Sequence, residues 1–292
     1  MRCEGTKTSR AQDEEACEAG HQVACARHGH RRILHGDPEI GAPLMEEACN
    51  RGVWDACNAL AGLYGEGQRL KMDLVRARKL AERACQSPER QGCNRLAIAL
   101  AKGEGGPEDP AGALALFDAL CEEAPGKACV NAGRHYLKGT GTEKNVTLAN
   151  GRFERACRGG EPAGCGMLGL VLLHERKVLD VSRGRDLVLR ACDDGYLGAC
   201  SESARMRLLG DHGATIDVEH GLRDAERACE RRLPGGCEVL GCAHHLGLGL
   251  RRDPVMAEQL FRSVGRPGPE NCSAQGLRPG DPVPSAEDGD DP

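Results

Sequence analysis

Aromatic side chains are scarce in this chain, with three Phe, three Tyr and one Trp among 292 residues. The chain therefore lacks the stacking platforms that single-stranded nucleic acid needs. Its formal net charge of -5 offers no electrostatic attraction to nucleic acid or to an anionic membrane surface. No apolar run approaches the roughly 20 residues of a membrane-spanning helix. These absences exclude nucleic-acid partners and a membrane span.

Recognisable catalytic signatures are also missing. The chain has no Ser-x-x-Lys and no Lys-Thr-Gly sequence, the usual signals of a serine β-lactamase. The densest histidine group, His28, His30 and His35, is flanked by arginines, which favours a solvated face over a metal site. The recurring Gly-x-Gly segments follow no predicted strand and indicate turns, not a nucleotide loop. We therefore expect no catalytic residue, no metal ligand and no cofactor.

What the chain does contain is a repeat marked by cysteine. Seven pairs, each with seven residues between its members, follow one another with first-cysteine spacings of 32, 36, 36, 36, 35 and 37. A period in this range predicts one supersecondary unit copied and stacked along the chain. The pairs are Cys17 and Cys25, Cys49 and Cys57, Cys85 and Cys93, Cys121 and Cys129, Cys157 and Cys165, Cys192 and Cys200, Cys229 and Cys237.

Two further patterns recur in register with the pairs. Only Gly or Ala stands four residues after each second cysteine and, from Cys49 onward, eight residues before each first cysteine, as close helix packing requires. From Cys49 onward an Asp or Asn stands twelve residues before each first cysteine, and before Gly265 in a final degenerate copy, where its side chain can cap a helix N-terminus. These residues are Asp37, Asp73, Asp109, Asn145, Asp180, Asp217 and Asp253. Each unit then consists of helix A, a glycine turn, and helix B ending at the next first cysteine.

The predicted fold is all-α, an α-solenoid of helix-turn-helix repeats. Residues 1–23 resemble a helix B without a preceding helix A. Seven repeats fill residues 24–265 as one unbroken array, and residues 266–292 form a disordered, acidic tail rich in Pro and Gly. Asn145 also begins a glycosylation sequence, but its place in the cap series favours the structural role.

The cysteine pairs have three interpretations. Each pair spans the turn between consecutive helices, so a local disulfide is the favoured one. Structural zinc usually needs ligands two to four residues apart, which these pairs do not offer. Buried thiols acting as small hydrophobic side chains are the third. Cys3, Cys242 and Cys272 fall outside the pattern, and Cys242 is either a buried thiol or bonded to Cys272.

Disulfides persist in oxidising compartments, which favours a secreted or periplasmic protein. No charged start or apolar stretch marks a signal sequence between Met1 and Gly20. The expected explanation is that upstream sequence was removed or that the start was placed late.

The repeat resembles the Sel1-like branch of the tetratricopeptide superfamily. The Leu/Ala-Gly, Tyr and Gly-x-Gly positions of segments 56–67 and 128–141 carry this resemblance. The added cysteine pair in each copy is similar to the Helicobacter cysteine-rich proteins. The resemblance implies a right-handed solenoid with one disulfide per repeat and a role in protein interaction. Some members are described as penicillin-binding with weak β-lactamase activity, and a related assembly factor resides in the mitochondrial intermembrane space.

The leading functional hypothesis is a scaffold that binds an unidentified protein or peptide on its concave helix A face. Side chains that vary between copies would supply the affinity, namely Leu63, Ala99, His135 and Met206. The alternative, which rests on the resemblance alone, is a weak penicillin-binding protein or β-lactamase with a β-lactam or peptidoglycan-derived ligand. The mitochondrial intermembrane space is the alternative location.

Overall fold

The computed structural model describes residues 5–90, 92–175, 178–266, 268 and 272. These residues form fifteen α-helices and one short 3₁₀ turn, and they contain no strand. The helices are α1 (Gly5–Glu18), α2 (Gln22–Leu34), α3 (Pro38–Asn50), α4 (Trp54–Glu66), α5 (Leu74–Ala84), α6 (Cys93–Lys102), α7 (Pro110–Glu123), α8 (Lys127–Lys138), α9 (Val146–Arg158), α10 (Pro162–Glu175), α11 (Val178–Asp193), α12 (Leu197–Leu209), α13 (Val218–Glu230), α14 (Pro234–Leu246) and α15 (Pro254–Ser263), with the 3₁₀ turn η1 at Asp211–Gly213.

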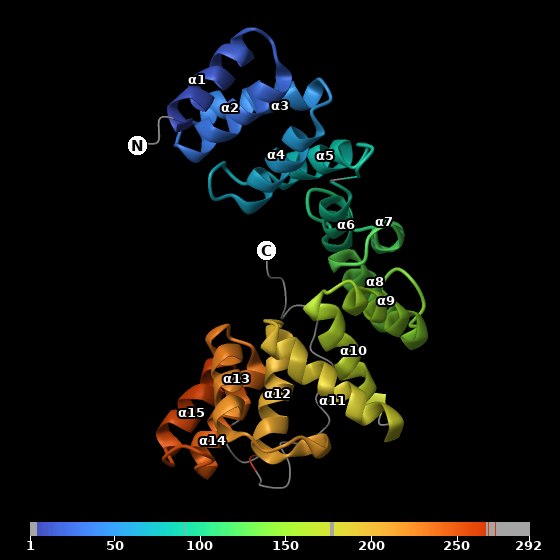
Figure 1. Ribbon diagram of the computed structural model, residues 1–292, viewed down its shortest axis with the longest axis vertical. Coiled ribbons are helices and arrows are strands. Elements are labelled where there is room, and N and C mark those ends of the chain that lie inside the picture. The colour runs from blue at the N-terminus through green and yellow to red at the C-terminus, as the bar shows by residue number, and fades with distance from the viewer. Residues whose placement is uncertain (1–4, 91, 176–177, 267, 269–271, 273–292) are drawn as a thin grey trace. The chain divides into compact units, whose positions relative to one another are not determined.

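The helices alternate in role as the repeat predicts. Even-numbered helices from α2 to α14 are the A helices, and odd-numbered helices are the B helices. Each A helix begins near a second cysteine, and α1 takes the place of the expected unpaired helix B. Hairpins such as α2 with α3 and α14 with α15 lie side by side (Figure 1). The all-helical solenoid with about one disulfide per repeat is therefore confirmed.

The chain divides into two compact units, a division that the repeat pattern did not indicate. Unit 1 contains residues 1–120 and 140–142, and unit 2 contains residues 121–139 and 143–292. Unit 1 has its core around Met45, Leu60 and Leu80. The main core of unit 2 surrounds Phe153, Leu168 and Val188. In unit 2 the A helices α8, α10, α12 and α14 also touch one another in succession, which makes a continuous layer.

The small-residue positions are where the two helices of a hairpin approach most closely. A Cβ added at Gly29 on α2 would stand 2.7 Å from the carbonyl oxygen of Gly41 on α3. At Gly169 on α10 the corresponding distance, to the Gly184 oxygen on α11, is 2.8 Å. Real Cβ atoms do not come this near to backbone oxygens, so these hairpins require glycine at both positions.

One position on helix B faces the small residue on helix A. It stands four residues before the first cysteine, and its size varies from copy to copy. Phe153 on α9 faces Gly133 on α8, where an added Cβ would stand 2.5 Å from the ring. In the α4–α5 hairpin the same two positions are Ala61 and Ala81, both fully buried. The α8–α9 hairpin is therefore closed by a glycine against a phenylalanine, and the α4–α5 hairpin by two alanines.

Most predicted caps are present. The Asp73 side chain accepts a hydrogen bond from the Arg76 backbone N–H at 2.9 Å, and Asn145 accepts one from Leu148 at 3.0 Å. The structural role of Asn145 thus agrees with the sequence interpretation. Asp37 precedes α3 but makes no capping bond, and instead pairs with Arg32 at 3.3 Å.

Asp180 was predicted to precede its helix, and this helix start is wrong. Helix α11 begins at Val178, so Asp180 lies within its first turn. The segment before it, His174 to Leu179, contains none of the glycines that end helix A in other copies. Without a left-handed glycine to stop the chain at the usual point, the register of the helix start shifts. By contrast, Gly139 ends α8 in the left-handed region at φ 74°.

The expected tail, residues 266–292, lies outside the described residues except for Arg266, Gly268 and Cys272. The Arg266 side chain pairs with Glu238 of α14 at 2.5 Å. Cys272 lies at bonding distance from Cys242 of the same helix, with an S–S distance of 2.03 Å and a Cα–Cα distance of 5.3 Å. Arg266 and Cys272 therefore both contact α14.

Candidate functional site

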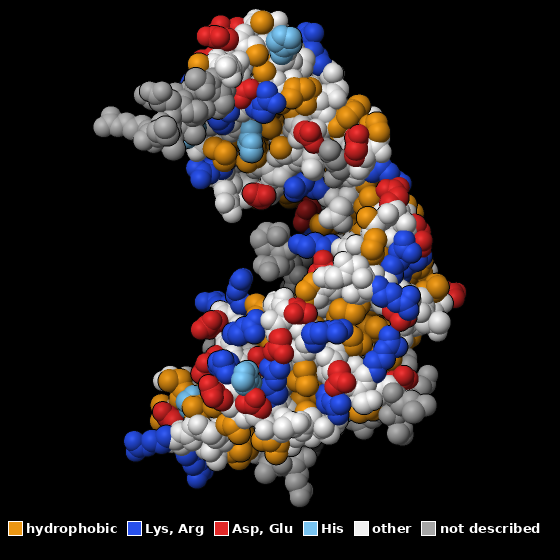
Figure 2. All heavy atoms as spheres, in the orientation of Figure 1, with side chains coloured by type: hydrophobic (Ala, Val, Ile, Leu, Met, Phe, Trp, Pro, Cys, Tyr) orange, Lys and Arg blue, Asp and Glu red, His pale blue; other side chains and the backbone are white. Residues whose placement is uncertain are grey.

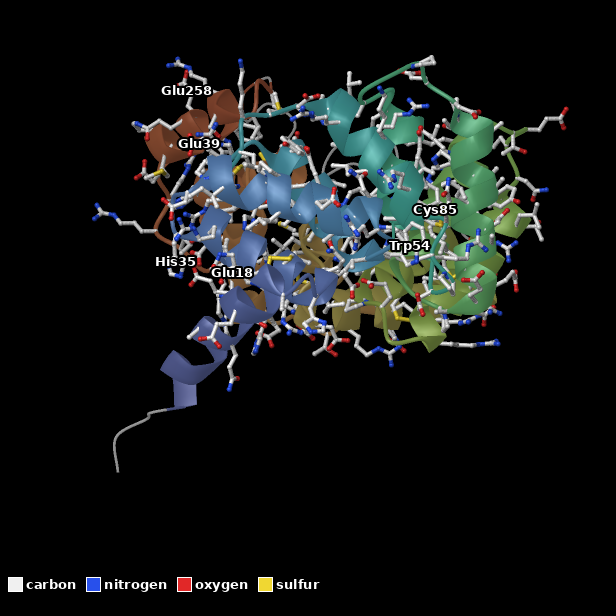
Figure 3. The ribbon with its side chains drawn as sticks, turned by 90° about the horizontal axis from the view of Figure 1, so that it is seen from above. Glu18, His35, Glu39, Trp54, Cys85 and Glu258 are labelled. Atoms are coloured by element: carbon white, nitrogen blue, oxygen red, sulfur yellow. A yellow bond between two sulfur atoms is a disulfide. The ribbon has the colours of Figure 1, made fainter. Side chains whose placement is uncertain are left out.

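The seven cysteine pairs all adopt one local geometry. The first cysteine stands at the end of helix B and the second in the first turn of helix A, with Cα–Cα distances between 4.4 and 4.9 Å. Figure 3 labels Cys85, where α5 ends, and draws sulfur–sulfur bonds in yellow. These distances are those of disulfides. The pairs lie one per turn along the chain and do not converge on a single site.

The disulfides differ in how well they are covered. Cys49, Cys121 and Cys192 are fully buried. Cys17, Cys85, Cys157 and Cys229 are half-buried. Each buried first cysteine has an arginine from the next repeat at its backbone carbonyl: Arg83 reaches Cys49 at 3.4 Å, Arg155 reaches Cys121 at 2.7 Å and Arg227 reaches Cys192 at 3.3 Å.

These arginines share one sequence position, two residues before the first cysteine of their own repeat. At the other copies that position holds Glu47, Ala119, Arg190 and Ser263. Glu47, Ala119 and Ser263 cannot supply a guanidinium, and Arg190 makes no hydrogen bond to Cys157 among the contacts of the described residues. The carbonyl oxygens of Cys49 and Cys192 also accept from the backbone N–H groups of Gly52 and Gly195, each at 3.0 Å, so the arginine adds a second donor at the end of helix B. Sequence reasoning missed this role, although the recurring arginine was a visible signal.

The helix A face was predicted from Leu63, Ala99, His135 and Met206, which stand six residues after the second cysteine. The structure shows that this position turns toward the core, because Met206 is fully buried and Ala99 is 7 % exposed. Leu63 and His135 are half-buried. Positions two and five after the second cysteine are both half-buried in α8 and in α12. They are Asn131 and Arg134 in α8 and Glu202 and Arg205 in α12, whereas in α10 Leu170 is half-buried and Met167 is buried.

One of these pairs belongs to a compact charged cluster at the end of α12. The Arg205 guanidinium donates to both carboxylate oxygens of Glu202 and to Asp211. His212 Nε2 lies 3.5 Å from Glu202 Oε1. Burial alone would raise the pKa of Glu202, but the contacts with His212 and Arg205 outweigh it and lower the pKa to about 2. Glu202 is therefore ionised at any physiological pH.

A second polar group is buried between α12 and α13. The Asp224 carboxylate accepts hydrogen bonds from Ser203 Oγ at 2.7 Å and from Arg207 Nη1 at 2.6 Å. Arg207 also donates to Asp193 at 2.8 Å. Arg207 stands where other copies carry Tyr or Leu, so this departure from the repeat is compensated by a buried acidic partner. Asp224 lies close to Cys192 and Cys200 as well. Those two cysteines form a disulfide and offer no thiolate, so the group is not a metal site.

The histidines singled out from the sequence are distributed over several elements. His28 and His30 are half-buried on α2, and His35 follows its end. His244 and His245 are both half-buried near the end of α14. Figure 2 shows basic and acidic side chains interspersed over the visible face of unit 2, without a large patch of one sign. No helix among the described residues has both the length and the apolar character to cross a bilayer.

The fold and its cysteine pattern define a class, the α-solenoids of helical hairpins with a disulfide at each inter-repeat turn. The family model of the Sel1 repeat matches residues 54–88, 90–124, 126–161 and 236–263. The chain therefore contains Sel1 repeats, and such repeats generally mediate protein–protein interaction.

Solved structures share the fold. The structure of c5321, described as a protective antigen present in uropathogenic Escherichia coli strains and displaying an SLR fold, superposes with a TM-score of 0.70 at 19% identity. That match covers 87% of this chain and 55% of the antigen. A Sel1 repeat protein from Oxalobacter formigenes gives a TM-score of 0.70 at 19% identity, over 83% of this chain and 97% of that protein.

Among curated proteins, cytochrome c oxidase assembly factor 7 from Xenopus tropicalis is 29% identical over 115 residues. Cytochrome c oxidase assembly factor 7A from Xenopus laevis gives the same identity over the same length. Each match covers 37% of this chain and 49% of the relative. The chain thus spans about half the length of the curated relatives it matches.

Proposed function

We propose that this protein is a protein-interaction scaffold that binds a protein or peptide segment along the A-helix face of unit 2. One observation carries the proposal. The packing position four residues after the second cysteine is Gly or Ala in every copy, whereas the surface positions change character from copy to copy. In α8 they are Asn131 and Arg134, and in α10 the half-buried position is Leu170. A layer that is uniform inside and varied outside suits recognition of an extended partner.

The A layer of unit 2 offers a partner three kinds of contact in succession. Asn131 and Arg134 supply hydrogen-bond donors, Leu170 supplies a half-buried apolar contact, and the Glu202–Arg205 ion pair supplies a polar contact without net charge. Arg205 is largely occupied by Glu202 and Asp211, so it contributes rigidity more than a free positive charge. We infer a partner segment with an apolar anchor flanked by polar residues.

The proposed setting is an oxidising compartment outside the reducing cytosol, either secreted or periplasmic. Eight disulfides, including Cys242–Cys272, support it, because bonds of this kind are rare where glutathione and thioredoxin keep thiols reduced. Alkylation of the native protein should leave all sixteen of these half-cystines unlabelled. Free thiols at the paired positions in protein purified without reductant would contradict the setting.

The binding proposal is tested by placing a photo-crosslinking amino acid at Leu170 and, as a matched control, at Arg223. Arg223 lies on the outer helix α13 and is 53% exposed. We expect a defined partner to be crosslinked from Leu170 and not from Arg223, and we expect Leu170→Arg to abolish its binding. Equal crosslinking from both positions, or binding unaffected by Leu170→Arg, would refute the A-layer site.

A second candidate follows from the similarity to cytochrome c oxidase assembly factor 7. On this proposal the protein works in the mitochondrial intermembrane space, which also permits disulfides. Import into isolated mitochondria, with protease protection and oxidation of the cysteine pairs, would support it. Failure of import together with efficient export in a bacterial host would favour the secreted or periplasmic setting.

A further inference from the structure

The Cys157–Cys165 disulfide differs from its six counterparts in its surroundings. Half-buried Cys157 lines a cavity of about 480 Å³ between α9 and α11. Arg158, Arg183 and Arg190 line the same cavity, together with Glu154 and Asp186. A disulfide at the wall of an arginine-rich cavity is accessible to a reagent that is small enough to enter the cavity and carries negative charge.

The charge of this cavity is not balanced. Glu154 pairs with Arg158 and with Arg183, each at 2.9 Å. Asp186 is engaged by Arg185, which is not part of the lining, at 2.9 Å. Arg190 has no hydrogen bond or ion pair to another described residue. Three guanidinium groups therefore meet one available carboxylate, and an anion that enters the cavity gains attraction from Arg190 without first displacing a partner.

Arg190 also explains why this disulfide is uncovered. It stands at the position from which Arg83, Arg155 and Arg227 close over the carbonyls of Cys49, Cys121 and Cys192. Those three first cysteines are fully buried, whereas Cys157 is half-buried. In this copy alone the arginine is present at that position and lines an open cavity instead of covering the turn.

The two sulfurs are unequal as reaction partners. Cys165 is 8% exposed and stands in the first turn of α10, where the N-terminal end of the helix dipole stabilises a thiolate. Cys157 stands at the end of α9 and is the more accessible of the two. Access favours attack on Cys157, and the helix position makes Cys165 the better leaving group.

We propose that Cys157–Cys165 is a thiol-exchange site for a small anionic thiol of the glutathione type. The thiolate attacks the Cys157 sulfur and forms a mixed disulfide there. The Cys157–Cys165 bond breaks, and its electron pair leaves on Cys165, which then takes up a proton. The incoming thiol is oxidised to the mixed disulfide while Cys165 is reduced, so no further reagent is needed. The carboxylates of the thiol lie against Arg190 and Arg183.

The test treats the native full chain with glutathione or with cysteamine, a cationic thiol, at equal thiolate concentration. After acid quenching and alkylation, peptide mapping identifies which disulfide has opened and where the adduct lies. We expect Cys157–Cys165 to open first, with glutathione on Cys157, and about five-fold faster than with cysteamine, as expected for one charge contact at water-like screening. Arg190→Ala should remove that preference, and the control Arg223→Ala should leave it unchanged.

Three outcomes would overturn the proposal. Faster opening at another half-covered disulfide, such as Cys85–Cys93 or Cys229–Cys237, would show that the cavity does not direct the reaction. Equal rates with the two thiols would show that the arginines do not select charge. Retention of the preference in Arg190→Ala would remove Arg190 from the site. Arg190 makes no hydrogen bond or ion pair to another described residue, so Arg190→Ala is expected to fold as the parent protein does. Circular dichroism spectra of the two proteins test this.

Discussion

The Arg155 side chain on α9 donates a hydrogen bond of 2.7 Å to the backbone carbonyl of Cys121, which stands one repeat earlier. A residue of one copy thereby completes the helix end and covers the disulfide of the copy before it. The contact links two features that the sequence presents separately, the cysteine pair and the arginine two residues before the next pair. It also divides the disulfides of this chain into covered and uncovered ones.

Arg155→Ala should therefore accelerate reduction of Cys121–Cys129 by a neutral dithiol. Its guanidinium covers the Cys121 carbonyl, and its loss opens a path to a sulfur that is now fully buried. The rate at Cys85–Cys93 should not change, because the corresponding sequence position in the next repeat holds Ala119. Time-resolved alkylation and peptide mapping measure both rates in one sample. An unchanged rate at Cys121–Cys129 would show that the arginine does not limit access.

Replacing both Cys121 and Cys129 by serine should lower the free energy of unfolding by about 2.5 kcal/mol, the chain-entropy value for so short a loop. Both residues are fully buried, so the serine hydroxyls add a desolvation cost. Denaturant unfolding monitored by circular dichroism gives the difference. The double replacement of Cys242 and Cys272 serves as a comparison outside the repeat series. An unaltered midpoint for the Cys121 and Cys129 variant would mean that this disulfide has no structural role.

Gly133→Ala should destabilise the protein by about 1–3 kcal/mol, because the added methyl group overlaps the Phe153 ring. An added Cβ would lie 2.5 Å from that ring. The combination with Phe153→Leu should recover part of the loss. Gly151→Ala on the exposed side of α9 is the matched control, since nothing lies within 4 Å of its added Cβ. The control should stabilise the helix by about 0.5–1 kcal/mol, and a loss there equal to that of Gly133→Ala would contradict the packing argument.

Asp224→Ala should cost about 3–5 kcal/mol, because it leaves the Arg207 guanidinium without its buried counter-ion. The Asp224 side chain is only 4% exposed and that of Arg207 only 13%. The double variant Asp224→Leu with Arg207→Leu restores the apolar pairing found in other copies and should regain most of the stability. Thermal unfolding of the three proteins forms the test. A double variant no more stable than Asp224→Ala would show that the polar pair is not interchangeable with an apolar one.

The stability of unit 2 should depend on pH through Glu202. Its pKa is about 2 in the folded protein against 4.5 for the ordinary carboxyl, so the folded state binds its proton less readily. The contribution is complete above about pH 4.5, amounts to about 3 kcal/mol at most, and is lost as the pH falls toward 2. Glu202→Gln should lower the melting temperature at pH 7 and have little effect near pH 2.5. Glu219→Gln is the control, because the Glu219 side chain is 84% exposed. An effect of Glu202→Gln that does not change with pH would contradict the link between the Glu202 pKa and stability.

Local patterns in the sequence were sufficient for the hairpins, the small-residue contacts and six of the seven helix starts, because each depends on residues close together in the chain. The orientation of helix A was predicted wrongly by one residue, because the residue six positions after the second cysteine was expected at the surface and Met206 there is buried. Met206 and Leu170 both belong to variable positions, and only packing against the neighbouring helices decides which of the two is buried. The arginine-lined cavity at Cys157 could not be predicted from the sequence. It depends on Arg190 making no hydrogen bond to the Cys157 carbonyl, whereas Arg155 at the equivalent position bonds to the Cys121 carbonyl. Periodicity describes what the copies share, and this cavity is a difference between copies.

The pairing of Gly133 with Phe153, and of Ala61 with Ala81, has a consequence for how such a chain can change in evolution. A recombination event that joined α8 to α5 would leave Gly133 facing Ala81, and the volume that the Phe153 ring fills would be lost. That product is penalised by the cavity, whereas exchange of a complete hairpin carries both members of the pair together. The heritable module of this protein is therefore the A–B hairpin, and duplications or deletions that respect its borders are the ones expected to survive.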